Sequence, residues 1–228
     1  MPNVLAASSL TRVFGEGDTS VTALDHVNIE IEAGEFTAII GPSGSGKTTL
    51  LHLLGGLDNP TSGSVFLSGT NIATMSGNEL SDFRRDHIGF IFQAYNLIPV
   101  LSAEENIEYI MLLQGKPHAE RHARTLEMLS KVGLDSLGER RPAQLSGGQQ
   151  QRVAVARAMA SSPDIILADE PTANLDSKTG ASLLDLMRDL NEEQGMTFVF
   201  STHDQMIMDR ARRLVTLRDG RIEQDERR

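Results

Sequence analysis

The sequence predicts an α/β fold in which a mainly parallel β-sheet is covered by helices, and three observations favour it. From Ser146 onward, short apolar runs alternate with helical segments, which is the order that a parallel sheet requires. A glycine-rich loop joins one apolar run to a helix in the first quarter of the chain. A length of 228 residues with 39% hydrophobic residues is sufficient to bury one sizeable core.

Short apolar runs bounded by glycine mark the predicted strands of the first hundred residues, which are VNIEI (27–31), FTAII (36–40), SVFLS (64–68) and IGFIF (88–92). Residues 96–145 then carry apolar residues at three- and four-residue spacing, which predicts a helical region. Beyond Ser146 the predicted order is helix, strand 164–168, helix 177–193, strand 197–201, helix and strand 213–217. The final DERR is predicted to be a frayed end.

Composition narrows the class of protein. A net charge of -10 argues against a protein that holds nucleic acid along a basic face, because phosphate neutralisation dominates such binding. The absence of cysteine excludes disulfides, thiolate metal sites and a thiol nucleophile, and it fits a reducing compartment. The start of the chain lacks a signal-peptide pattern, and no run approaches the about 20 apolar residues of a membrane-spanning helix. We therefore expect any function at a membrane to need a partner.

The loop between FTAII and the next helix matches the pattern G-x-x-x-x-G-K-[ST]. Its glycines let backbone N–H groups turn towards a β-phosphate, and the start of the helix adds positive potential. We expect Lys47 to reach β- and γ-phosphate oxygens and the Thr48 hydroxyl to ligate Mg²⁺. The predicted nucleotide-binding residues of this phosphate loop are Gly41, Pro42, Ser43, Gly44, Ser45, Gly46, Lys47, Thr48 and Thr49.

Two adjacent carboxylates, Asp169 and Glu170, follow four apolar residues at the predicted end of a strand. Acids on a buried strand need a cation or a proton-transfer task. We expect Asp169 to hold Mg²⁺, directly or through water, and Glu170 to polarise an attacking water. A solvated turn before Pro171 would be the more common explanation of these acids on their own, but the phosphate loop upstream reverses that preference.

Three single residues fit the same chemistry, although each is weak evidence alone. Gln93 follows IGFIF, where its amide could bond both Mg²⁺ and the attacking water; a surface amide is the simpler alternative. His203 follows TFVFS, where a neutral imidazole could donate to a γ-phosphate oxygen; a structural histidine is the alternative. Phe14, in a glycine-flanked loop, offers a flat face for stacking on adenine, or else belongs to the core.

A second glycine-marked helix start occurs at LSGGQ, residues 145–149, before an alanine-rich helix. Taken alone, this pattern indicates either a capped loop or a further anion-binding helix start. The residues of this second helix start are Ser146, Gly147, Gly148 and Gln149.

Together these motifs resemble the nucleotide-binding subunit of ATP-binding cassette (ABC) transporters, from about Val4 to Ile222. The matching features are GPSGSGKTT, the glutamine after IGFIF, LSGGQ, ILADE, ANLD (173–176) and STHD. The resemblance implies one domain over 1–228 with a RecA-like P-loop NTPase core, 1–95 and 146–228, that includes an N-terminal antiparallel β subdomain. It also implies an α-helical signature subdomain over 96–145.

The resemblance also implies what the second helix start does. In that family two subunits sandwich two ATP molecules head to tail, so Ser146 and Gly148 would serve a nucleotide held by another copy of the chain. Departures from the family pattern are small. Thr48 and Thr49 replace the more usual Ser-Thr, and Phe14 stands where many relatives have tyrosine, so ATP hydrolysis with Mg²⁺ remains the implied activity.

Three longer stretches resemble the lipoprotein-releasing and macrolide-exporter group (LolD and MacB type): LLHLLGGLDNPTSG, RRDHIGFIFQAYNLIPVLSAEENI and LADEPTANLDSKTG. The cell-division cassette FtsE is similar too. The resemblance implies a peripheral subunit on the cytoplasmic face of the inner membrane. Its partner would be an integral permease with an extracytoplasmic domain, for lipoprotein extraction or for export of lipophilic compounds or peptides. A mechanotransmission ATPase that regulates cell-envelope hydrolases without transport is the alternative.

Two further points follow from the chain's patterning. A chromosome-maintenance or DNA-repair ATPase would need long heptad-patterned arms between the phosphate loop and the signature, and the spacer lacks them. The apolar segment YNLIPVL, residues 95–101, either receives a short cytoplasmic helix of the permease or packs inside the helical region; the sequence leaves both open.

We predict that Lys47→Ala abolishes ATP hydrolysis and weakens ATP binding by about tenfold or more, because a charge-assisted bond to phosphate is lost. Steady-state phosphate release and equilibrium nucleotide binding measure the two effects. Wild-type turnover in this variant would contradict the assignment of the loop.

Overall fold

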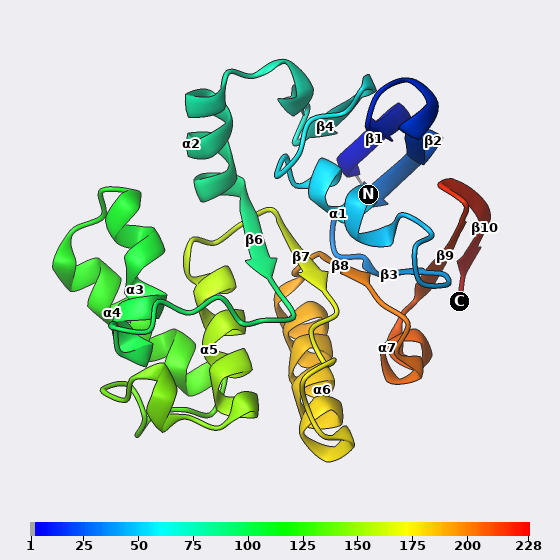
Figure 1. Ribbon diagram of the computed structural model, residues 1–228. Helices are drawn as coiled ribbons and strands as arrows, with labels where there is room; N and C mark the ends of the chain where they lie inside the picture. The colour runs from blue at the N-terminus through cyan, green and yellow to red at the C-terminus, as the bar shows by residue number, and fades with distance from the viewer. Residues whose placement is uncertain (1–2) are drawn as a thin grey trace.

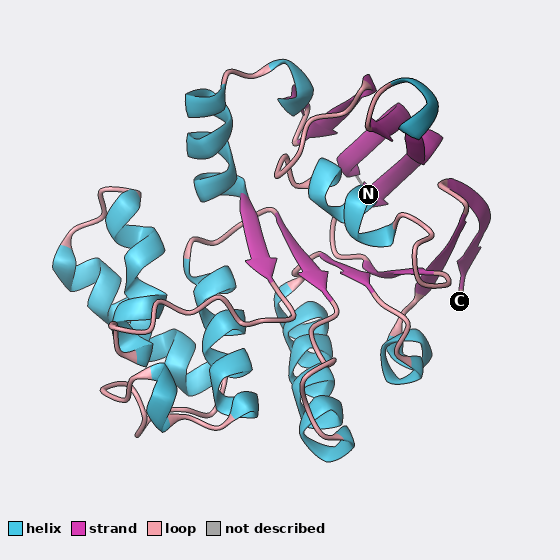
Figure 2. Ribbon diagram, viewed as in Figure 1, coloured by secondary structure: helices cyan, strands magenta, loops and turns pink. Residues whose placement is uncertain are grey.

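The computed structural model describes residues 3–228, and its centre is a six-stranded sheet in the order β10-β9-β3-β8-β7-β6 (Figures 1 and 2). The strands are β3 (Phe36–Ile40), β6 (Ile88–Ile91), β7 (Ile165–Asp169), β8 (Phe198–Ser201), β9 (Arg213–Arg218) and β10 (Arg221–Arg227). Every pairing is parallel except that of β10 with β9. The predicted mainly parallel sheet is confirmed.

A second sheet is antiparallel and has the order β2-β1-β4-β5. Its strands are β1 (Asn3–Phe14), β2 (Val21–Glu32), β4 (Ser62–Leu67) and β5 (Thr70–Asn71). It forms the antiparallel N-terminal subdomain that the family resemblance implied. The sequence did not mark β1 as a strand, because irregular pairing with β2 interrupts its inside–outside alternation, as between Ala7 and Leu10.

Seven α-helices surround the sheets in the described part of the chain. They are α1 (Lys47–Leu54), α2 (Gly77–His87), α3 (Ala103–Leu113), α4 (His118–Lys131), α5 (Gly147–Ala160), α6 (Ser177–Gln194) and α7 (Gln205–Arg210), with short 3₁₀ segments at Gly17–Thr19, Ile72–Thr74 and Pro142–Gln144. Figure 1 shows α3, α4 and α5 grouped on the side away from the antiparallel sheet. Helix α2 was not predicted; it buries only Leu80, so it carries no apolar stripe.

Both faces of the central sheet are buried, as expected of parallel strands. On β7, Ile166 and Ala168 enter a core shared with the helical side, whereas Ile165 and Leu167 enter a core shared with α1 and the antiparallel sheet. Figure 1 shows the same division, with α6 and α7 on one side of the sheet and α1 on the other. All four side chains are at most 1% exposed, so the middle of the strand offers no place for polar chemistry.

The carboxyl ends of neighbouring strands therefore define the functional edge. The phosphate loop follows β3, Gln93 follows β6, the acidic pair closes β7 and His203 follows β8. Because β3, β8, β7 and β6 are consecutive neighbours in one parallel sheet, these residues must meet at one edge.

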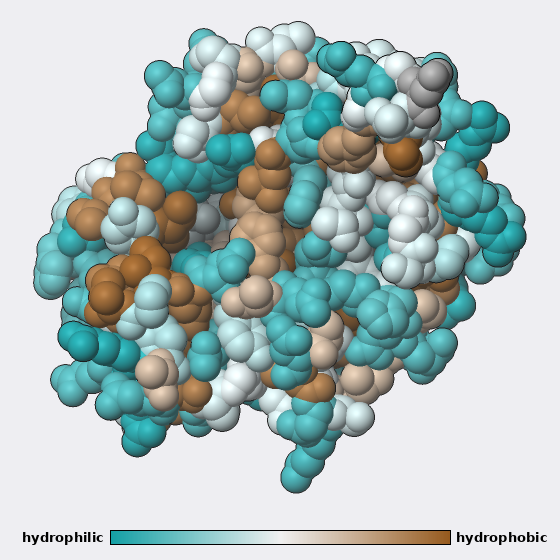
Figure 3. Space-filling model, viewed as in Figure 1, coloured by the Kyte–Doolittle hydropathy of each residue, from teal (hydrophilic) through white to brown (hydrophobic). Residues whose placement is uncertain are grey.

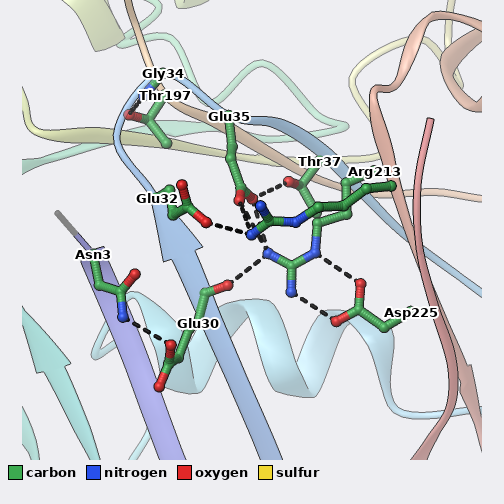
Figure 4. A network of polar contacts seen from close by, with 10 residues as sticks. Asn3, Glu30, Glu32, Gly34, Glu35, Thr37, Thr197, Arg213 and Asp225 are labelled. Atoms are coloured by element: carbon green, nitrogen blue, oxygen red, sulfur yellow. Dashed lines mark hydrogen bonds and ion pairs between the residues drawn. The ribbon is translucent and has the colours of Figure 1, made fainter. Parts of the chain in front are cut away.

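The prediction of a frayed C-terminus is wrong, since residues 221–227 form β10 against β9. Figure 4 shows the contacts that hold this hairpin, centred on Arg213, whose side chain is 8% exposed. Its guanidinium donates to both oxygens of Asp225 at 2.8 and 2.7 Å, to Glu35 at 2.9 Å and to the backbone oxygen of Glu30 at 2.6 Å. A buried partner explains why a sequence as polar as DERR is ordered.

We predict that Asp225→Asn lowers the free energy of unfolding at neutral pH by about 1–2 kcal/mol, because the carboxylate of a charge-assisted pair is lost. The Asp225 side chain is 39% exposed, so solvent screens the pair and the loss is smaller than for a fully buried pair. Hydrogen bonding to Arg213 lowers the pKa of Asp225 below its ordinary 3.8. Its contribution is therefore complete above pH 3.8 and is lost as the pH falls through the lower, folded-state pKa.

Urea denaturation at neutral pH and in buffers below pH 3.8 measures the difference between wild type and variant. Glu223→Gln is the control, because its partner Arg218 is exposed and the expected change is within about 0.5 kcal/mol. A difference that stays constant as the pH falls would show that the carboxylate charge is not what stabilises the hairpin.

Candidate active site

The phosphate loop joins β3 to α1 and leaves the start of that helix open. Gly46 precedes α1 in a left-handed conformation, with φ of 101°, and no side chain caps the helix. The first backbone N–H groups of α1 are therefore available to an anion. At Gly41 an added Cβ would lie 2.1 Å from the backbone oxygen of Leu217, so only glycine fits that turn.

Lys47 is the buried cation of the loop, with 8% of the residue exposed. Its Nζ donates to the backbone oxygens of Gly41 and Pro42 at 2.8 and 2.9 Å. Carbonyl oxygens leave the positive charge without a neutralising partner. The ammonium group is therefore placed to exchange these bonds for phosphate oxygens.

A pocket of about 570 Å³ brings four separate segments together around this loop. Eleven sequence-predicted residues line it: Gly41, Pro42, Ser43, Gly44, Gly46, Lys47, Thr48, Thr49, Gln93, Glu170 and His203. Ala23 and Ala173 complete the lining. Ser45 is outside the lining; it is 3% exposed and its hydroxyl has no hydrogen-bond partner.

Thr48 and Asp169 approach each other at the pocket, with Thr48 Oγ1 donating to Asp169 Oδ1 at 3.2 Å. Gln93 lies just beyond β6 with an exposed side chain, and its backbone oxygen accepts from Asn174 at 2.9 Å. The described residues hold no cluster of three or more His, Cys, Asp or Glu suited to a metal. A hydroxyl, a carboxylate and an amide oxygen fit Mg²⁺, which takes few protein ligands and keeps water and phosphate oxygens.

Glu170 is held from two sides at the edge of the pocket. His203 Nδ1 lies 2.6 Å from one of its carboxylate oxygens, and the Thr202 hydroxyl donates to the other at 3.1 Å. The backbone of Glu170 is left-handed, with φ of 45°, which is costly for a non-glycine residue and typical of functional sites. Sequence reasoning did not single out Thr202, because a buried hydroxyl beside a histidine has no distinctive pattern.

The signature residues lie outside this pocket. Ser146 is exposed and caps α5 by accepting from the backbone N–H of Gln149 at 3.3 Å, and the Gln149 side chain accepts from the Ser146 backbone. Both glycines pack within their own chain: a Cβ at Gly147 would lie 2.8 Å from the Tyr95 hydroxyl, and one at Gly148 would lie 2.3 Å from Thr179 Cγ2. The four predicted residues from 146 to 149 do not contact the chain's own phosphate loop pocket.

Phe14 is the last residue of β1 rather than part of a loop, and it lies opposite Val21 of β2. Pairing with β2 fixes this position, so the predicted loop is wrong, although the ring is 42% exposed and not part of the core. Phe14 does not line the 570 Å³ pocket, but Ala23, which follows Val21 closely on β2, does.

A second pocket of about 410 Å³ lies between β6, α2 and α3. Its lining combines apolar side chains, among them Phe90, Phe92, Tyr109 and Leu113, with three arginines, Arg84, Arg85 and Arg157. Figure 3 shows hydrophobic residues gathered over the neighbouring α3 and α4. Within 95–101 only Asn96 lines the pocket, and Leu97 packs against the core.

The fold and the pocket define an ATP-binding cassette ATPase. A family model described as ABC transporter matches residues 24–173, and this chain belongs to that family. Hydrolysis of ATP is the activity of its members. The resemblance inferred from the motifs is thereby confirmed.

Individual relatives support the assignment over the whole chain. An uncharacterised ABC transporter ATP-binding protein of Thermotoga maritima is 49% identical over 228 residues, which cover 100% of this chain and 97% of that protein. The macrolide export ATP-binding/permease protein MacB of Hyphomonas neptunium is 46% identical over 98% of this chain, which spans only 35% of that protein. The ATP-binding cassette MJ0796, solved as a dimer bound to ADP and Pi, has a TM-score of 0.90 and 44% identity, covering 98% of each chain.

We predict that Gly148→Ala lowers the free energy of unfolding by about 1–3 kcal/mol, because the new methyl group meets Thr179 Cγ2 and the Thr179 hydroxyl is held by Asp176 at 2.6 Å. In a Thr179→Ser background the same change is neutral or stabilises by up to about 1 kcal/mol, since serine keeps the hydroxyl but lacks the methyl. Chemical denaturation of the four proteins tests this coupling. Equal effects in both backgrounds would contradict the packing explanation of Gly148.

Proposed function

We propose that this chain is the ATP-hydrolysing subunit of a membrane transporter, in which two copies close around two ATP molecules and drive a permease. The observation that carries the proposal is the convergence of the open start of α1, Lys47, Gln93, Glu170 and His203 on one pocket. Each group has a distinct role towards a triphosphate, and together they would bind the phosphates, position the attacking water and accept its proton.

In this proposal Lys47 and the first N–H groups of α1 bind β- and γ-phosphate oxygens. Glu170 orients the attacking water and accepts its proton. Neutral His203 has a single ring N–H, so it holds the Glu170 carboxylate without nucleotide and exchanges that bond for one to the γ-phosphate when ATP is bound. Thr48, Asp169 and Gln93 are the residues that would hold Mg²⁺, which would neutralise charge on the phosphate oxygens. Gln93 also positions the water.

The proposed head-to-tail dimer explains the second glycine-marked helix start. Ser146 is exposed and α5 begins outside the chain's own pocket, so its anion-binding end is free to meet the γ-phosphate held by another copy. The dimeric form of MJ0796 supports this arrangement. In this scheme residues 1–95 and 146–228 form the nucleotide-binding core and residues 96–145 a helical subdomain that carries the signature towards the other copy.

The proposed membrane partner is a permease with an extracytoplasmic domain, which would hold the chain peripherally at the cytoplasmic face of the inner membrane. Among the described residues, no helix is long and apolar enough to cross a bilayer. The 410 Å³ pocket, with its apolar side chains and arginines, suits a short amphipathic helix of such a partner. The process that the chain drives would be lipoprotein extraction or export of lipophilic compounds or peptides, and the relatives named macrolide export ATP-binding/permease protein MacB support export over import.

A mechanotransmission ATPase that regulates cell-envelope hydrolases without transport is the second candidate, because its cassette would present the same pocket. Purification of the complex from detergent-solubilised membranes separates the two by the identity of the bound partner.

We predict that Glu170→Gln slows ATP hydrolysis by about 10²- to 10⁴-fold and leaves ATP binding intact, because the amide keeps the shape but cannot accept the proton. ATP then persists between two chains. Light scattering is expected to find a monomer without nucleotide and a dimer in saturating ATP and Mg²⁺.

Adding Ser146→Arg to Glu170→Gln is expected to abolish the dimer while ATP still binds. Ser76→Arg is the matched control, because Ser76 is also exposed and forms the same capping box at the start of α2, away from the signature. Loss of the dimer in both double variants would trace the effect to helix stability, and a Glu170→Gln monomer in saturating ATP would refute closure through the signature.

A further inference from the structure

We propose that Arg12 is a positioning residue for the nucleotide base: it holds the Phe14 ring from behind so that a purine stacks on the opposite face. The inference rests on the proposed function, since it concerns the base of the same ATP molecule. It assigns a role to a residue that belongs to none of the nucleotide motifs.

The contacts of Arg12 define its role. Its guanidinium carbon lies 4.5 Å from the centroid of the Phe14 ring, which is cation–π distance. Its Nη2 donates to Asp58 Oδ1 at 2.9 Å, and the Arg12 side chain is 23% exposed. One face of the ring is thus covered by a group that is itself held by Asp58, while Phe14 as a whole remains 42% exposed.

The uncovered ring belongs to an apolar platform beside the phosphate pocket. Phe14 and Val21 are directly opposite in the β1–β2 pair, so their side chains share a face. Both are exposed, Val21 by 62%, at a position where the pocket-lining Ala23 follows on the same strand. An exposed aromatic and aliphatic pair next to a triphosphate site fits a planar heteroaromatic base.

Asp58 connects this platform to the phosphate loop. It lies just beyond the end of α1, the helix that begins at Lys47, and the segment that follows Asp58 is hydrogen-bonded to β1. Thr61 donates from its backbone to Thr11 at 2.8 Å, and its hydroxyl accepts from the Val13 backbone at 3.0 Å. The Arg12–Asp58 pair therefore joins the strand that carries the stacking ring to the segment that follows α1, the helix whose start forms the phosphate site.

The experiment compares the affinity of the full chain for ATP and for inorganic tripolyphosphate, which has the phosphates but no base. Phe14→Ala is expected to weaken ATP binding about tenfold, and Arg12→Met about threefold to tenfold, both without a change for tripolyphosphate. Asp58→Asn is expected to weaken ATP binding less than Arg12→Met does, because the amide oxygen can still accept a hydrogen bond from Arg12. Arg12→Lys recovers part of the loss, since it keeps the cation. Arg212→Met, which removes another arginine with a single carboxylate partner, leaves both affinities unchanged.

The outcomes separate this inference from the proposed function. If Phe14→Ala weakens ATP binding and Arg12→Met does not, base stacking stands and the role of Arg12 is refuted. If Arg12→Met weakens ATP and tripolyphosphate equally, Arg12 acts on the phosphate loop and the inference is again wrong. If Phe14→Ala leaves ATP affinity unchanged, base stacking on Phe14 and with it the inference are wrong, while loss of tripolyphosphate binding in Lys47→Ala still tests the phosphate site of the proposed function.

Discussion

Burial of the central sheet on both faces is the constraint on which the rest of this structure depends. The middle of each strand is occupied by side chains with almost no exposure, such as Ile166 and Leu167, so polar chemistry is confined to the strand ends. Parallel pairing then places the ends of β3, β8, β7 and β6 at one edge. Because of this topology, Lys47 and His203 line the same pocket although they are far apart in the sequence.

The two glycine-marked helix starts have similar sequences but opposite local chemistry. Helix α1 has no side-chain cap, and the ammonium group of its first residue, Lys47, is bonded to carbonyl oxygens. The N-terminal end of α1 is therefore a site that needs an anion. Helix α5 has a complete capping box from Ser146 and Gln149, and its glycines pack closely against the side chains of Tyr95 and Thr179. The chain therefore stabilises its second helix start itself, although Ser146 at that end is exposed.

How much the sequence predicted follows from how strongly each segment is buried. Strands β3, β7 and β8 were predicted because they are continuous apolar runs, and the phosphate loop because its spacing is specific. Strand β10 is polar and nearly all exposed, so its order depends on the distant Arg213, a contact no local pattern reveals. The same holds for Thr202 and Arg12, whose roles depend on partners from other strands or loops.

Side chains of α5, the helix that begins at the signature, bond to the segments beside the hydrolytic residues and beside the apolar pocket. Gln151 is fully buried and donates to the backbone oxygens of Pro171 at 2.8 Å and Phe92 at 3.4 Å, next to Glu170 and Gln93. In the last turn of α5, Arg157 donates to the backbone oxygens of Tyr95 and Asn96 and lines the 410 Å³ pocket. Because Gln151 is fully buried and has no water to replace its bonds, a shift of α5 would either break these bonds or move the segments at Pro171 and Phe92 with it. Helix α5 thus connects the signature, the segments beside Glu170 and Gln93, and the apolar pocket within one rigid element.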